Sequence, residues 1–325
     1  MASTKEKLIE LLEKQNGEYL SGTAIADSLG ISRAAIWKNI KQLENEGYLI
    51  EAVTNKGYRL DPLSDVVNEK TISENLQNVN GIIHLEVKDE VSSTNTILKE
   101  RAQDLPDWYV LAAGSQNAGR GRTGRDFFSP KGSGVYLSVL LRPDIPVTDA
   151  GKLTTAAAVA ACRAIETWTE AEPVIKWVND VFVNGKKVCG ILTEASVNFE
   201  TGAPDWIVTG IGFNVYQPEG GFPTEIATTA GAISEHRQNN LRAKLAAGFI
   251  DNFYDICSRL SSVDLHKEYK RRCFIVGKPI FVLRGEEKIP AFAVDIDKDY
   301  GLKVRYEDGK TEILSAGEVS IRPGE

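Results

Sequence analysis

The sequence predicts an α+β protein in three parts, and three patterns along its 325 residues lead to that prediction. Short amphipathic helices and one hairpin make up the beginning, strands and helices alternate through the middle, and short strands around turn residues make up the end. We expect a winged helix-turn-helix over residues 1–64, a mixed-sheet α/β domain over residues 65–271 and a small SH3-like β-barrel over residues 272–325. The length allows this, because domains of roughly 150 residues are usual and the spread is wide.

The first part begins with three predicted helices. Ser3 and Glu6 have the spacing of a capping box, and the apolar pattern after them continues until Gly17. A second helix is expected between the cap Ser21 and Gly30, and a third between the cap Ser32 and Gly47. The strand-like residues 48–53 and 58–60 then flank a hairpin turn signal. This order is typical of a winged helix-turn-helix.

The third helix presents a polar and basic stripe of the kind that enters a major groove. The residues expected to contact DNA are Ser32, Arg33, Trp37, Lys38, Lys41 and, on the wing, Lys56. The alternative is a three-helix interaction module whose basic residues are solvated surface. Residues 1–60 hold eight basic and eight acidic residues, a net charge of zero. A module without net charge should bind DNA weakly when it is alone. We therefore predict that specific binding needs two copies of the module on a DNA site with two-fold symmetry.

The middle part is expected to hold a sheet. Asp61, Pro62 and the polar stretch to Lys70 predict a linker into it. The strand-like runs are residues 84–87, 108–113, 135–141, 174–177, 188–193 and 206–215, and the helical runs are residues 94–101, 153–168 and 241–260. Hairpin-length links join several neighbours, so we expect a largely antiparallel or mixed sheet with helices on one side.

A basic, glycine-rich loop is the most informative segment of the chain. Residues 119–125 read GRGRTGR, and residues 119–131 hold four basic residues against one acidic, a local charge of +3. The glycines match GxGxxG formally, but Ser129-Pro130 and the following glycines prevent the helix that a dinucleotide-binding loop must open. Arginine forks and exposed backbone N–H groups suit a phosphate or an acyl phosphate instead. The alternative is a disordered basic loop on the surface.

Three further motifs are weak when taken singly. Residues 176–180, KWVND, and the lysines 186 and 187 would set an anionic metal ligand and an ammonium beside one phosphate, although solvated charge is the default for such lysines. Ser92–Asn95 alone is typical of a helix N-cap. Thr209–Asn214 places glycines in a strand, which often marks the close approach of a ligand or of another backbone.

Together and in this order the motifs closely resemble those of the biotin-protein ligases. The segments that carry the resemblance are Ser-Ser-Thr-Asn95, Gly-Ser-Gln116, the GRGRTG loop, Lys-Trp-Val-Asn-Asp180, Lys187-Val-Cys-Gly190 and Gly-Ile-Gly-Phe-Asn214. With a winged helix in front, nearly the full chain resembles the bifunctional biotin ligase and biotin operon repressor of bacteria. The resemblance implies a class II synthetase-like central domain. Val178 departs from the pattern, because proline is more frequent there in the family.

The resemblance implies a two-step reaction that needs no protein nucleophile. Biotin would attack the α-phosphate of ATP, giving biotinyl-5′-AMP and pyrophosphate, and a lysine of a biotin carrier protein domain, as in acetyl-CoA carboxylase, would then accept the biotinyl group. It also implies Mg²⁺ as cofactor and biotinyl-5′-AMP as corepressor. The other implied partners are operator DNA and a second copy of the chain, with which it would form a homodimer when the ligand binds.

The resemblance also assigns roles to residues. Biotin is expected to contact Ser93, Thr94, Asn95, Gln116, Arg120, Gly121, Arg122, Lys187, Gly190 and Gly210. ATP or the adenylate is expected at Arg122, Lys176, Asn179 and Asn214. Catalysis is expected from Arg120, Arg122, Lys187 and Asp180, with Asp180 either binding Mg²⁺ or orienting the attacking amine. The hydroxyl and amide groups suit the ureido ring of biotin, Phe127 would cover the ligand, and Gly190 and Gly210 would leave room for it.

Composition excludes other classes of function. Three histidines and four cysteines, none paired at ligand or redox spacing, argue against a zinc, Ser-His-Asp or Cys-His enzyme. The net charge of -7 gives no nucleic-acid signal for the chain as a whole. The charged beginning and the lack of an apolar run of ~20 residues predict a cytoplasmic protein that does not enter a membrane.

Two alternative functions and one open role remain. A transcription factor that senses a small ligand would share the first two parts but would not need these motifs together. A lipoate or other acyl ligase would share the chemistry, but its substrate would lack the ureido ring. The last part, with strand-like residues 279–283, 289–295, 302–306, 311–314 and 318–321, is expected to be structural, with nucleotide or carrier contact as a less favoured addition.

Overall fold

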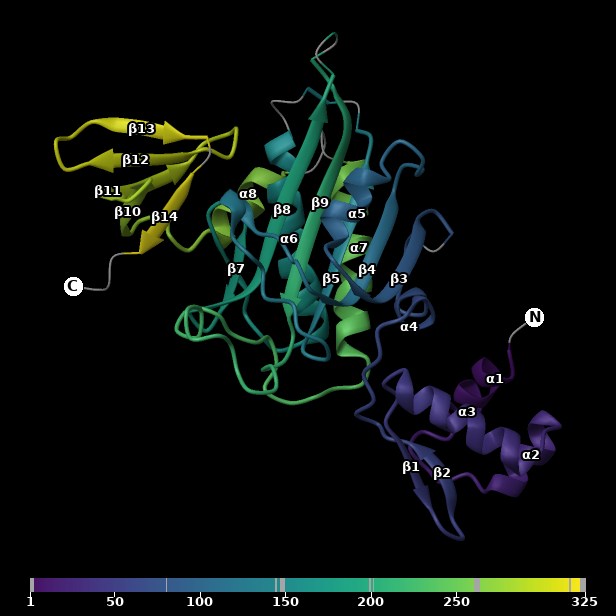
Figure 1. Ribbon diagram of the computed structural model, residues 1–325. Helices are drawn as coiled ribbons and strands as arrows, with labels where there is room; N and C mark the ends of the chain where they lie inside the picture. The colour runs from purple at the N-terminus through teal and green to yellow at the C-terminus, as the bar shows by residue number, and fades with distance from the viewer. Residues whose placement is uncertain are drawn as a thin grey trace.

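The structure is a computed structural model that describes residues 3–79, 81–143, 145–146, 150–198, 200, 202–259, 264–315 and 317–321. The predicted domain limits at residues 1 and 325 and the predicted helix end at residue 260 lie outside these residues. Figure 1 shows a small helical module at the N-terminus, a central sheet with its helices, and a separate sheet of yellow strands near the C-terminus. The predicted fold class is confirmed.

The N-terminal module has the predicted helices and hairpin. Its elements are α1 (Thr4–Glu13), α2 (Gly22–Leu29), α3 (Arg33–Asn45), β1 (Ile50–Val53) and β2 (Gly57–Leu60). Ser3, Ser21 and Ser32 each accept a hydrogen bond from the first turn of the helix that follows, as their positions in the sequence predict. Apolar side chains of all three helices meet in one buried core, which holds α3 in place.

The central sheet has seven strands in the order β3-β4-β5-β9-β8-β7-β6. Their bounds are β3 (His84–Val91), β4 (Tyr109–Gln116), β5 (Gly134–Leu141), β6 (Val174–Lys176), β7 (Asp180–Val183), β8 (Lys186–Val197) and β9 (Pro204–Asn214). Among the strand pairs of this sheet in the described ranges, β3 and β4 are parallel and the others are antiparallel. The prediction of a mixed sheet is confirmed. Strand β7 was not predicted, because its four residues are too few for a clear alternation.

Helices cover both faces of this sheet, so the prediction of helices on one side is wrong. The long helices α6 (Ala150–Trp168) and α7 (Leu241–Ser258) pack on one face and form the main core. The short helix α5 (Thr94–Glu100) packs Leu98 against Leu111, Leu140 and Val208 on the other face. Strand β5 is therefore buried along its whole length, and its continuous apolar run is the sequence sign of a two-sided cover.

The predicted linker of residues 61–70 joins the two parts but is packed rather than free. Asp65 is fully buried and forms an ion pair of 3.1 Å with Arg242 at the start of α7. The backbone N–H of Asn240 donates to the carbonyl of Ser64. Lys70 already belongs to a helix that was not predicted, α4 (Glu69–Ser73). The polar residues of this stretch are thus bound to protein partners, which composition alone does not reveal.

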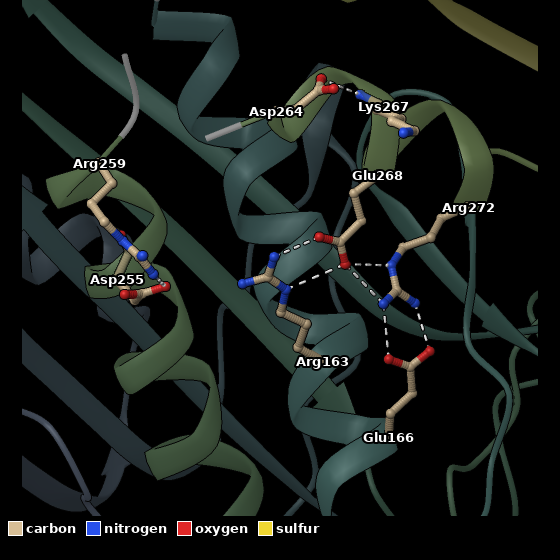
Figure 2. A network of polar contacts seen from close by, with 8 residues as sticks. All are labelled: Arg163, Glu166, Asp255, Arg259, Asp264, Lys267, Glu268 and Arg272. Atoms are coloured by element: carbon tan, nitrogen blue, oxygen red, sulfur yellow. Dashed lines mark hydrogen bonds and ion pairs between the residues drawn. The ribbon is translucent and has the colours of Figure 1, made fainter. Parts of the chain in front are cut away.

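A second helix that was not predicted, α8 (Leu265–Arg272), lies against α6. Figure 2 shows that Arg272 forms paired hydrogen bonds with Glu166 of α6 and two further ones with Glu268, which also binds Arg163. Burial acts to raise the pKa of Glu268, but the two arginines outweigh it and hold that pKa below its ordinary value. Tyr269 of α8 donates a hydrogen bond to the carbonyl of Val178, which fixes the turn between β6 and β7.

The C-terminal part is a five-stranded antiparallel sheet in the order β13-β12-β11-β10-β14, consistent with an SH3-like barrel. Its strands are β10 (Pro279–Arg284), β11 (Glu287–Ile296), β12 (Leu302–Tyr306), β13 (Thr311–Leu314) and β14 (Glu318–Ile321), which confirms the five predicted runs. None of the helices in the described ranges has the length and apolar character needed to cross a membrane.

Candidate active site

A cavity of about 620 Å³ brings together every residue predicted to bind biotin, nucleotide or metal. They are Ser93, Thr94, Asn95, Gln116, Arg120, Gly121, Arg122, Lys176, Asn179, Asp180, Lys187, Gly190, Gly210 and Asn214. These residues come from the start of α5, the end of β4, the glycine-arginine loop, the turn between β6 and β7, and the paired strands β8 and β9. The volume lies within the range of roughly 300–1,000 Å³ that is usual for small-molecule sites.

One wall of the cavity is the beginning of α5. Ser93 caps this helix by accepting a hydrogen bond from the backbone of Thr96, so its predicted role as an N-cap is confirmed. The backbone N–H of Thr94 donates to Gln116 Oε1 at 2.9 Å. Gln116 in turn donates to Ser129 Oγ at 2.9 Å. The amide of Gln116 is therefore fixed in orientation, and it joins the helix start to the far end of the basic loop.

The glycine-arginine loop is hydrogen-bonded to itself and lines the cavity, contrary to the alternative of a disordered surface loop. Gly121 N–H donates to the carbonyl of Arg125 at 2.7 Å, and Phe127 N–H donates to that of Gly119 at 2.9 Å. A side chain at Gly119 would place a Cβ 2.5 Å from the carbonyl oxygen of Phe127, so only glycine fits there. The loop contains one 3-10 turn, Arg122–Gly124, and no α-helix, in agreement with the argument against a dinucleotide fold.

Arg122 connects three segments that are far apart in sequence. Its guanidinium donates to Asn179 Oδ1 at 3.0 Å and to the carbonyl of Gly317 at 3.2 Å. Asn179 also donates to the carbonyl of Ile191 on β8 at 2.7 Å. The basic loop, the turn of the KWVND motif and the C-terminal sheet thus meet at one cation, which is the group best suited to bind a phosphate from several sides.

Comparison with known proteins identifies the family. The biotin/lipoate A/B protein ligase family model matches residues 87–214, and a helix-turn-helix domain model matches residues 4–59. The bifunctional ligase/repressor BirA of Bacillus subtilis is 41% identical over 237 residues, 72% of each chain. That of Escherichia coli is 30% identical over 324 residues, 98% of this chain and 97% of the relative. This chain belongs to the biotin-protein ligase family.

A solved structure agrees with this assignment. The biotin protein ligase from Aquifex aeolicus in complex with biotin and ATP superposes with a TM-score of 0.62, at 28% sequence identity. The match covers 74% of this chain and 99% of that one. The shared part therefore leaves about a quarter of this chain uncovered, and the helix-turn-helix match, at residues 4–59, is separate from the ligase match at residues 87–214.

The predicted catalytic lysine lies opposite the predicted metal ligand. Lys187 Nζ forms an ion pair of 2.7 Å with Asp180 Oδ1. Within the described ranges, no three His, Cys, Asp or Glu side chains are grouped so that they could hold a metal ion. The carboxylates among the lining residues are those of Asp126 and Asp180, and Asp180 is already paired with a lysine, so a metal here would depend on phosphate oxygens for most of its ligands.

The glycines of β8 and β9 give room to the protein's own side chains. A Cβ on Gly210 would lie 1.9 Å from Asn95 Oδ1, and one on Gly212 would lie 2.4 Å from the ring of Phe127. The same ring is 2.9 Å from a Cβ placed on Gly190. The space predicted for ligand at Gly190 and Gly210 is thus occupied here by Phe127 and Asn95. The prediction that Phe127 covers the site agrees with its position among the lining residues.

Two groups of lining residues were missed by reasoning from the sequence. The first is in the connection after β9 and comprises Phe222, Ile226, Thr228, Thr229 and Ala230. The second is in the C-terminal sheet and comprises Leu283, Gly317, Val319 and Ser320. Neither group contains a motif, and both consist of neutral residues that composition does not single out. The C-terminal part therefore contacts the cavity, whereas the sequence favoured a purely structural role for it.

The residues predicted to contact DNA lie on α3 and the wing. Ser32 caps α3, and Trp37 is exposed to 58% of its surface, the largest value among the exposed large hydrophobic side chains. Lys41 is paired with Glu44, whereas Lys56 lies over the ring of Tyr19. An indole so exposed contributes nothing to the core, which agrees with a binding role for this face.

Proposed function

We propose that this protein is an ATP-dependent biotin-protein ligase that also represses transcription in response to biotin. The single observation that carries the proposal is the cavity, on which all residues predicted for biotin, ATP and catalysis converge. Two comparisons support it. A relative that matches 98% of the chain is named a bifunctional ligase/repressor, and a similar structure was solved with biotin and ATP.

The first chemical step is adenylation. An oxygen of the biotin carboxylate forms a bond to the α-phosphorus of ATP, and the bond from that phosphorus to the pyrophosphate oxygen breaks. Negative charge accumulates around phosphorus, and Arg120, Arg122 and Lys187 are the cations we assign to neutralise it. No protein side chain forms a bond to the substrate, which agrees with the scarcity of histidine and cysteine.

The second step is transfer to a carrier lysine. The amine of that lysine attacks the acyl carbon of biotinyl-5′-AMP, AMP leaves with the bonding electron pair, and the amine gives up a proton. We assign Asp180 to this amine or to Mg²⁺, and its ion pair with Lys187, which we assign to the reacting phosphate, supports either role. Mg²⁺ would enter with ATP and supply further positive charge at the phosphates.

A direct labelling experiment tests the ligase proposal. The protein is incubated with Mg-ATP, a biotin carrier domain and either biotin or lipoate, and the carrier is probed with streptavidin and by mass spectrometry. We expect a biotinylated carrier lysine only with biotin and ATP present. Lipoylation instead would support the other ligase of this family, and an unmodified carrier in both cases would refute a ligase function.

We also propose that biotinyl-5′-AMP acts as corepressor by promoting a homodimer that sets two winged helices on operator DNA. The support is the net charge of zero on residues 1–60, which gives one module few phosphate contacts. We place this activity in the cytoplasm, where the free cysteines of the chain would stay reduced. Analytical ultracentrifugation with and without biotin and ATP should show dimers only with both, and unchanged self-association would contradict the corepressor role.

A further inference from the structure

A chain of hydrogen bonds leads from the cavity wall into the sheet behind it. Thr94 Oγ1, at the cavity, lies 2.7 Å from Ser138 Oγ, and Ser138 Oγ lies 2.6 Å from Asn95 Oδ1. Asn95 Nδ2 donates to Glu194 Oε2 at 2.9 Å and to the carbonyl of Leu192 at 3.2 Å. Ser138 and Glu194 are not among the residues that line the cavity, and Ser138 is fully buried.

The far end of this chain has a fixed polarity. The carbonyl of Leu192 and the carboxylate of Glu194 accept hydrogen bonds and cannot donate, so the NH₂ group of Asn95 must face them. Lys99 pairs with the other carboxylate oxygen at 2.6 Å. Burial acts to raise the pKa of Glu194, but the hydrogen bonds from Lys99 and Asn95 keep it below its ordinary value, so the group is ionised at neutral pH. The amide oxygen of Asn95 therefore faces Ser138.

The number of hydroxyl protons fixes the direction of the remaining hydrogen bonds between Asn95 and the cavity. Ser138 has one hydroxyl proton, and Asn95 Oδ1 has none, so this proton lies between them. The 2.7 Å contact between Ser138 and Thr94 then needs the hydroxyl proton of Thr94. The other acceptor near that hydroxyl is Gln116 Oε1, but it is farther away, at 3.2 Å, and the single hydroxyl proton cannot serve both contacts. With its proton committed inward, Thr94 presents only lone pairs to the cavity.

We propose that Ser138 and Glu194 are positioning residues that make the Thr94 hydroxyl a hydrogen-bond acceptor and thereby select a substrate ring that carries N–H donors. This inference rests on the proposed function, because the ureido ring of biotin supplies such N–H groups. A ring without them, such as the dithiolane of lipoate, leaves the buried acceptor without a partner. A site built around a polar group rejects the analogue that lacks its counterpart far better than an apolar pocket rejects an added group.

The variant Ser138→Ala tests the inference with a matched control. Ser138→Ala frees the Thr94 proton without touching the cavity wall, so the KM for biotin should rise about tenfold, while kcat and the KM for ATP stay within about twofold. The control is Ser115→Ala on the neighbouring strand, where the hydroxyl of another buried serine donates to the carbonyl of Asp89 instead. It removes the same atom from the same sheet and should leave all three constants unchanged. Initial rates of pyrophosphate release with biotin and ATP give these constants.

A second set of variants separates positioning from general damage. Because Ser138 acts through Thr94, the double variant Thr94→Val/Ser138→Ala should bind biotin no worse than Thr94→Val alone. Glu194→Gln, which replaces an obligate acceptor by a group that can also donate, should raise the KM for biotin about threefold and provides the test if Ser138→Ala does not fold. Thermal unfolding of every variant reports the folded fraction.

The outcomes distinguish this inference from the proposed function. An active wild type whose Ser138→Ala and Glu194→Gln variants keep the wild-type KM for biotin overturns the inference and leaves the ligase proposal standing. Equal rises in the KM for biotin and for ATP, or additive losses in the double variant, also overturn it, because they show a structural effect. A wild type that releases no pyrophosphate with biotin overturns both.

Discussion

Lys187 Nζ lies 2.7 Å from Asp180 Oδ1, across the hairpin formed by β7 and β8. The pair joins two motifs that look independent in the sequence, the KWVND turn and the lysine hairpin. Their register sets Asp180 opposite Gly190, and the side chain of Lys187 extends over the same glycine, 3.2 Å from the position of a Cβ there. A hairpin of this kind holds an ammonium in a fixed place, which a flexible lysine at a surface would not achieve.

The first prediction concerns this pair. Lys187→Ala should lower the rate of adenylate formation by about 100-fold, because it removes a positioned cation from the developing charge. Asp180→Asn should lower it less, by about tenfold, since the lysine remains but loses its partner. The control is Lys186→Ala, whose side chain turns to the carbonyl of Thr228. Single-turnover adenylation measures all three, and an equal loss in Lys186→Ala would show that general charge, not position, matters.

The second prediction concerns Arg122. Arg122→Lys should lose about as much adenylation activity as Arg122→Ala, roughly 100-fold, because an ammonium cannot form the two separate bonds to Asn179 and Gly317. Lys131→Ala, an exposed position of the same basic loop, should stay near the wild-type rate. Full activity in Arg122→Lys would mean that only charge is required at this position. Circular dichroism at matched temperatures checks that folding is retained.

The third prediction concerns the DNA-binding face. The double variant Trp37→Ala/Lys38→Ala should weaken binding to operator DNA by at least about tenfold, and the loss of a lysine at a phosphate should reduce the salt slope by about one. Ligase activity and thermal stability should not change, because Trp37 is mostly exposed. Fluorescence anisotropy over a series of salt concentrations gives both numbers. The control is Lys14→Ala at the end of α1, and an equal effect there would indicate nonspecific charge.

The fourth prediction concerns the buried pair of Asp65 and Arg242. Asp65→Asn should lower the free energy of unfolding by about 3 kcal/mol, because it leaves the guanidinium of Arg242, exposed to 8%, without its counter-charge. Glu74→Gln removes an ion pair of 3.6 Å whose carboxylate is half exposed, and it should cost less than about 1 kcal/mol. Urea unfolding measures both. Similar small effects in the two variants would mean that water reaches the buried pair.

The fifth prediction concerns pH. Hydrogen bonds, first from Tyr109 and then from Arg101, hold the pKa of Glu86 at about 2, below its ordinary 4.5. A carboxylate with a depressed pKa stabilises the fold above its unfolded pKa, and that contribution is lost as the pH falls from about 4.5 to about 2. The free energy of unfolding of Glu86→Gln should therefore fall by about 1 kcal/mol less than that of the wild type over this pH interval. Unfolding curves at several pH values test it, with Glu90→Gln, an exposed position on the same strand, as control.

Much of the fold was predictable because the determining signals are local. The caps Ser3, Ser21 and Ser32 and the spacing of apolar residues act within one or two turns of helix, and the structure has all three helices, although the first ends at Glu13, before the predicted stop at Gly17. The same reasoning missed α4 and β7, which are too short to give a period. The same reasoning also predicted all helices on one face of the sheet, because no local pattern shows that Leu111 and Leu140 pack against α5.

The candidate site divides in the same way. Its charged and glycine-rich motifs were identified one by one, since guanidinium, ammonium and glycine have properties that do not depend on the fold. By themselves, the residues predicted a site for a crowded phosphate and a reaction without a histidine or cysteine nucleophile. Only the tertiary structure decided that Arg122 contacts Gly317, that Ser138 is hydrogen-bonded to Thr94, and that Phe222 and Ala230 line the cavity. The physical reason is that hydrogen-bond partners and burial arise from packing between segments far apart in the chain, and no local pattern encodes such pairs.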